Sequence, residues 1–142
     1  MARFFLGVAI AAGLLFSGLA RAEGLLVIAN SAVNVAAPLP IGQVAAIYLL
    51  RVTTWPDGSH IVPVNREATS RIREEFTSRV LQEDNADLTT YWNEMHFMGK
   101  LPPVVQESQE AMIAFIRNVP GSLGYFSGSV APPDDKVLAY VP

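Results

Sequence analysis

The sequence contains no cysteine, and only two of its 142 residues are histidines. A chain without thiols has no disulfides, no cysteine nucleophile and no cysteine-based zinc site. His60 and His96 lie far apart in the sequence, and neither has a ligand-like neighbour at metal-binding spacing. We therefore expect neither a metal site nor a cofactor.

Charge is also scarce, and positive charge most of all. Charged residues make up 16% of the chain, with 10 Lys+Arg against 13 Asp+Glu and a formal net charge of −3. This balance argues against a nucleic-acid partner. The 51% of hydrophobic residues is too high for a disordered chain. The length fits a single domain.

The first 22 residues have the composition of a secretory signal peptide. Arg3 supplies a positive charge, residues 4–19 form an apolar stretch, and the Ala-Arg-Ala at 20–22 is typical of a cleavage site. The apolar stretch is shorter than the roughly 20 residues that a membrane-spanning helix needs, although an uncleaved membrane anchor is the alternative. We expect cleavage after Ala22, a periplasmic or secreted domain over 23–142, and no membrane span after cleavage.

Segments typical of strands and helices alternate along the rest of the chain. Leu25–Ala29 is an uninterrupted apolar run, typical of a strand buried on both faces of a sheet. Ile72, Phe76 and Val80 recur every four residues, which indicates an amphipathic helix. The other predicted elements are a helix over 40–48, a polar loop over 83–87, a helix over 88–98, a helix capped by Ser108, and strands over 60–64, 123–126 and 137–141. This alternation predicts an α/β fold with a mostly parallel sheet flanked by helices.

The strongest candidate site follows the strand that ends near Val64. Parallel sheets bind ligands at the carboxyl ends of their strands, where helices begin and attract anions. Arg66, Thr69, Ser70 and Arg71 occupy that position, and they offer guanidinium and hydroxyl donors for a phosphate or carboxylate. We predict an oxyanion-binding site built from these residues. The alternative is an ordinary capped helix whose solvated arginines pair with glutamates at helical spacing.

No set of residues in the sequence forms a recognisable catalytic apparatus. The nucleophile elbow and the phosphate-binding P-loop are both absent. We therefore expect no enzymatic activity. Four aromatic residues could form a platform that binds carbohydrate, although their burial in the core is favoured. They are Trp55, Tyr91, Trp92 and Phe97.

Three stretches resemble the solute-binding proteins of phosphate ABC transporters, a family of type II periplasmic binding proteins. Residues 47–55, Ile-Tyr-Leu-Leu-Arg-Val-Thr-Thr-Trp, resemble the family's Ile-Phe-x-Gly-x-x-x-x-Trp, and residues 119–125 resemble its Gly-Ala-Ile-Gly-Tyr turn. The family's Arg-x-Asp-Gly-Ser-Gly-Thr motif, aligned on Phe76, places Arg66 on the phosphate-binding arginine and Ser70 on the serine. The resemblance runs from about Leu25 to Val141. It implies one lobe of a type II periplasmic binding protein, with inorganic phosphate or a similar oxyanion as the ligand.

The sequence also departs from that family at the motif itself. Thr69 and Arg71 replace the two glycines, and Ile72 replaces the threonine. The chain has no length for a second lobe, so a bound anion would stay exposed to water, where a charged pair contributes little. We therefore predict a phosphate-transporter-like solute-binding protein with a weak or vestigial oxyanion site. The alternative is an envelope protein-interaction module that has lost ligand binding, with an envelope protein or a second copy as its partner.

Overall fold

The computed structural model describes residues 23–128 and 131–142. The predicted signal segment, and with it the predicted cleavage after Ala22, lies outside the described residues. No helix in those two ranges has both the length and the apolar character needed to cross a membrane.

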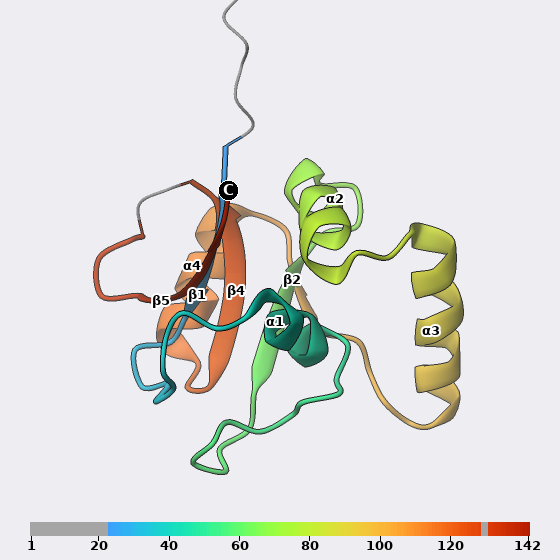
Figure 1. Cartoon of the computed structure of the whole chain (residues 1–142), viewed down its shortest axis with the longest axis horizontal. Coiled ribbons are helices and arrows are strands. Elements are labelled where there is room, and N and C mark those ends of the chain that lie inside the picture. Colours follow the sequence, from blue (N-terminus) through green and yellow to red (C-terminus); the bar gives the residue numbers. More distant parts are fainter. Residues whose placement is uncertain (1–22, 129–130) are drawn as a thin grey trace, which may run out of the picture.

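A single mixed sheet organises the described part of the chain (Figure 1). Its strands are β1 (Leu25–Ala29), β2 (Val62–Arg66), β3 (Val104–Gln106), β4 (Ser122–Ser127) and β5 (Lys136–Val141), in the order β3-β2-β4-β1-β5. β2 pairs in parallel with β3 and β4, whereas β1 pairs antiparallel with β4 and β5. Four of these strands therefore run in one direction, and β1 runs against them.

The α/β class is confirmed, but the prediction of a mostly parallel sheet misses the reversed direction of β1, which lies between β4 and β5. An apolar run indicates that a strand is buried, but it does not indicate whether the strand runs parallel or antiparallel to its neighbours. Residues of β1 alternate between two hydrophobic clusters: Leu25 and Val27 belong to one, Leu26 and Ile28 to the other. β1 is thus buried on both faces, as its composition predicts.

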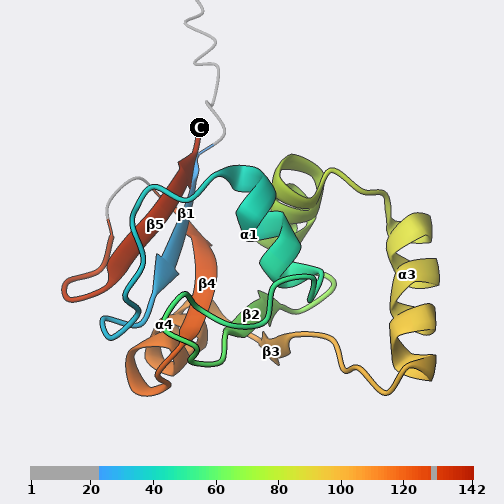
Figure 2. The same cartoon turned by 60° about the horizontal axis from the view of Figure 1, so that its bottom comes forward.

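Helices cover both faces of the sheet (Figure 2). The helices of the described ranges are α1 (Ile41–Tyr48), α2 (Arg71–Phe76), which continues as a π-helical turn, η1 (Thr77–Leu81), then α3 (Asn85–Phe97) and α4 (Gln109–Asn118), and of these α3 lies beside the sheet. α1, α2 and η1 supply Tyr48, Phe76 and Val80 to one cluster. α4 supplies Met112 and Ile116 to the other. The apolar side chains predicted to share one face of each of these helices therefore pack toward the sheet.

Side-chain caps explain where three helices begin. The Ser70 and Ser108 hydroxyls accept the backbone N–H of the third following residue, at 3.2 and 3.0 Å, and cap α2 and α4. The Ser108 cap is the one that the sequence predicts. The predicted polar loop over 83–87 is wrong in its second half, because the Asp84 carboxylate caps α3 by accepting the Asp87 N–H at 2.8 Å. The predicted strand over 60–64 lies two residues later, and β3 was not predicted.

α3 lies at the side of the molecule in both views (Figures 1 and 2). Among its residues only Met95 is buried. Large apolar side chains are exposed at its end and along the segment that follows; we call this set the apolar ridge, and it consists of Phe97, Met98, Leu101, Val104 and Val105. The ridge ends on β3, which pairs with β2 alone at the edge of the sheet.

Candidate functional site

A groove of about 780 Å³ lies between the α2–η1 segment and α3. Its inner wall combines Asn65, at the end of β2, with Thr69, Ser70 and Arg73. Its outer wall is the face of α3 that carries Trp92 and its neighbours. The groove therefore lies where the sequence predicts a ligand, beyond the carboxyl end of a parallel strand.

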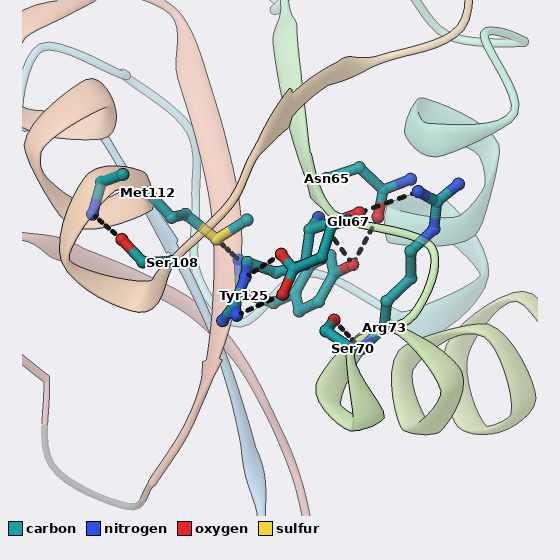
Figure 3. Close-up of polar contacts among 9 residues, drawn as sticks. Asn65, Glu67, Ser70, Arg73, Ser108, Met112 and Tyr125 are labelled. Carbon is teal, nitrogen blue, oxygen red and sulfur yellow. Dashed lines mark hydrogen bonds and ion pairs between the residues drawn. The ribbon is translucent and has the colours of Figure 1, made fainter.

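The guanidinium of Arg66 is bound to the chain's own carboxylate. Arg66 donates two hydrogen bonds, of 3.0 and 3.1 Å, to the neighbouring Glu67 (Figure 3). These bonds hold the pKa of the Glu67 carboxyl below its usual value. Arg66 does not contribute to the lining of the groove. Its charge is thus compensated internally, in a place where the resemblance implies a phosphate ligand.

The other three predicted residues divide between the groove and the solvent. Thr69 and Ser70 line the groove. Arg71 does not: its side chain is 84% exposed and pairs with Glu75 at 3.0 Å, one helical turn away. The structure therefore brings together two of the four predicted residues. Arg71 forms the ion pair at helical spacing that the capped-helix alternative describes. Arg66 does not fit that alternative, because it pairs with the adjacent Glu67 and its side chain is only 13% exposed.

Arg73 is the cationic residue that sequence reasoning missed. It lines the groove, and one guanidinium nitrogen donates to the Arg66 carbonyl at 2.8 Å. It forms no ion pair with any described residue. Figure 3 shows its side chain rising from α2 beside Asn65. The sequence spacing could have predicted this residue, because positions three apart at the start of a helix lie on the same face, and Arg73 follows Ser70 by three.

Asn65 forms the floor of the groove, and Tyr125 lies beneath it. The Tyr125 hydroxyl donates to Asn65 Oδ1 and accepts the Arg66 N–H at 3.3 Å (Figure 3). Burial raises the pKa of Tyr125 to about 12, so this hydroxyl keeps its proton at neutral pH. Asn65 is only 9% exposed, and its Nδ2 donates to no residue within the described ranges. Asn65 lines the groove, so its Nδ2, without an acceptor from the described chain, is available to an acceptor of a ligand.

The inner wall is therefore rich in donors, and Arg73 is its cation among the described residues. Thr69 and Ser70 offer hydroxyls, Asn65 offers an amide, and Arg73 offers the remaining guanidinium N–H groups. Glu74 also belongs to the lining and opposes an anion. The positive charge of the site comes from the Arg73 guanidinium. We assign none to the N-terminus of α2, because this helix spans only six residues before the π-helical turn. This arrangement can bind an oxyanion, and Glu74 limits its affinity.

The aromatic residues do not form a common platform. Trp55 is buried and donates from its indole nitrogen to the Gly121 carbonyl at 3.0 Å. Phe97 is 89% exposed on the apolar ridge. Trp92 belongs to the groove, and Tyr91 packs against it edge-on with ring centroids 5.1 Å apart.

Within residues 23–128 and 131–142, no three histidine or acidic side chains lie close enough together to hold a metal ion.

Comparison with known proteins supports the fold. No family model matches the chain, and no curated protein does either. Three similar solved structures are a protein described as a phosphate ABC transporter substrate-binding protein with bound phosphate from Clostridium perfringens (TM-score 0.64, 19% identity), an ABC-type phosphate transport receptor from Vibrio cholerae (0.63, 21%) and PstS from Borrelia burgdorferi (0.64, 14%).

Each match covers 82% of this chain. The chain in turn spans less than half of each similar protein, namely 44%, 45% and 47%. At these identities the likeness establishes the fold alone. The chain has the fold of one lobe of a phosphate-binding protein.

Proposed function

We propose that this chain is a periplasmic or secreted solute-binding protein, similar to those of phosphate transporters, and that it binds phosphate or a similar oxyanion in the groove between α2 and α3. One observation carries the proposal: Ser70, Thr69 and an Arg73 free of ion pairs converge on one groove. The phosphate-binding proteins that share the fold support the choice of anion. We further propose that the chain is not an enzyme.

The proposed binding is weak. Thr69 is exposed, so water reaches the donors, and Glu74 lies in the same lining. Charged contacts at such a site contribute up to about 1 kcal/mol each. We expect a dissociation constant of about 1 mM, equivalent to roughly 4 kcal/mol of binding free energy.

Calorimetry with phosphate on residues 23–142 tests this proposal. Arg73→Gln should weaken binding about tenfold, because it removes the charge-assisted hydrogen bonds to the anion. Arg71→Gln is the matched control, since it removes the same charge from the same helix outside the groove, and it should leave the affinity within about twofold. The proposal fails if neither heat nor a thermal shift appears at millimolar phosphate, or if both variants bind equally well.

The proposed location rests on the predicted signal peptide. Mass spectrometry of the protein recovered from the cell envelope or medium should find a chain that begins at Glu23. Detection of a chain that retains residues 1–22 would contradict cleavage and favour the alternative of an uncleaved membrane anchor.

The apolar ridge favours a second candidate function, an envelope protein-interaction module. Exposed apolar residues that lie together next to an unpaired strand edge are typical of protein contacts. If a second copy covers the ridge, sedimentation should detect a dimer that Phe97→Ser with Leu101→Ser disrupts, while Glu94→Gln on the same helix does not. A chain that is monomeric at high concentration and captures no envelope protein through these residues would remove this candidate.

A further inference from the structure

The groove extends well beyond the donors that would hold a phosphate ion. Its volume of about 780 Å³ lies within the roughly 300–1,000 Å³ range of pockets that hold small organic molecules. A phosphate ion bound by Ser70 and Arg73 fills only a small part of that volume. Leu81 and Leu88 contribute apolar surface to the lining, and a bare, strongly hydrated anion gains nothing from such surface.

Trp92 contributes an aromatic side chain to the outer wall, and its neighbours hold it in place. The Tyr91 ring packs edge-on against it, with an interplanar angle of 77°. Tyr91 in turn donates from its hydroxyl to the Leu49 carbonyl, and the Arg51 guanidinium lies 5.8 Å from the centre of its ring. These contacts tie this turn of α3 to the end of α1. The indole is therefore positioned before any ligand arrives, which lowers the entropy lost on binding.

The two walls together describe a ligand with two chemically different ends. The inner wall offers the Arg73 cation, the Ser70 hydroxyl and the unpartnered amide of the nine-tenths buried Asn65. The outer wall offers the Trp92 ring, with the Asn93 amide beside it for polar substituents. An anionic group at one end and a ring at the other would occupy both walls.

We propose that the ligand of this groove is an organic phosphate, a phosphate monoester whose organic part contains a planar ring, with the phosphate on Ser70 and Arg73 and the ring on Trp92. This inference rests on the proposed function and names the ligand class of the same site. Stacking between aromatic rings adds roughly 0.5–1.5 kcal/mol, which corresponds to a gain in affinity of roughly two- to tenfold.

Comparison of two probes tests the inference: inorganic phosphate, and phenyl phosphate as the simplest ring-bearing monoester. Phenyl phosphate should bind roughly two- to tenfold tighter to the wild-type chain and should change the fluorescence of Trp92. Trp92→Leu keeps the position apolar and should abolish the difference in affinity between the two probes. Phe97→Leu, an exposed aromatic on the same helix, is the matched control and should preserve the difference.

The outcomes separate this inference from the proposed function. Equal affinity of the wild-type chain for both probes overturns the inference and leaves phosphate binding intact, and this comparison does not depend on how any variant folds. Tighter binding of phenyl phosphate that survives Trp92→Leu also overturns it. If neither probe binds, the proposed function fails and the inference fails with it.

Discussion

At the scale of single residues, the Tyr125 hydroxyl fixes the floor of the groove. It satisfies both Asn65 Oδ1 and the Arg66 N–H, and its protonated state is the one that can donate. Its raised pKa has a consequence for stability. The unfolded chain releases this proton near pH 10, whereas the folded chain retains it until about pH 12. The tyrosine's contribution to stability is therefore complete below pH 10 and is lost as the pH rises through about 12.

Tyr125→Phe should lower the free energy of unfolding by about 1–3 kcal/mol at neutral pH, because Asn65 Oδ1 and the Arg66 N–H lose their shared partner. The variant should also lose less stability than the wild type between pH 10 and pH 12. Denaturant unfolding at several alkaline pH values measures both effects. Parallel curves for the two proteins across that interval would show that the Tyr125 pKa is not raised.

Glu67 decides whether Arg66 can take part in anion binding. Glu67→Gln removes the carboxylate that holds the Arg66 guanidinium, so the freed charge should tighten phosphate binding about threefold. Glu75→Gln releases Arg71 in the same way, outside the groove, and should change nothing. Phosphate calorimetry compares the two variants. An unchanged affinity in Glu67→Gln would mean that Arg66 is too distant to assist even when it is free.

At the scale of elements, an aromatic stack positions the α2–η1 segment. The Phe76 ring, at the end of α2, stacks on the Tyr125 ring with centroids 3.9 Å apart, and the Tyr48 ring of α1 packs edge-on against Phe76 at 4.6 Å. All three side chains are fully buried. The stack therefore links the helix that carries Ser70 and Arg73 to β4, and it fixes the inner wall of the groove relative to the sheet.

Phe76→Ala should lower the free energy of unfolding by about 3–5 kcal/mol, because it leaves a cavity between α1, α2 and β4. Val105→Ala, on the exposed edge strand, should cost no more than about 0.5 kcal/mol. Denaturant unfolding of both variants gives the comparison. Similar costs for the two substitutions would contradict the central place of the aromatic stack.

Local signals allowed most elements to be predicted from the sequence. The β1 run, the Ser108 cap and the apolar stripe of α2 all act within a few residues of the positions that they specify. β3 has three residues and no alternation, and only its pairing with β2 makes it a strand. The start of α3 was missed because its acidic residues were interpreted as a solvated loop, although Asp84 is a capping residue.

At the scale of the whole molecule, the site depends on contacts between distant parts of the chain. Thr69 and Ser70 could be predicted, since the end of a strand and the start of a helix are visible in the sequence. The outer wall could not, because it depends on where α3 lies relative to α2 (Figure 1). The direction of β1 likewise follows from its pairing with β4 and β5, which are separated from it by most of the chain.

The central claim is that the groove between α2 and α3 binds an oxyanion through its inner wall. A titration with phosphate, followed residue by residue in nuclear magnetic resonance spectra, tests it most directly, with chloride as the control for ionic strength. The account predicts that the backbone signals of Thr69, Ser70 and Arg73 and the side-chain amide signal of Asn65 shift together and saturate at millimolar phosphate. Signals that stay unchanged at these residues, or that move equally with chloride, would contradict it.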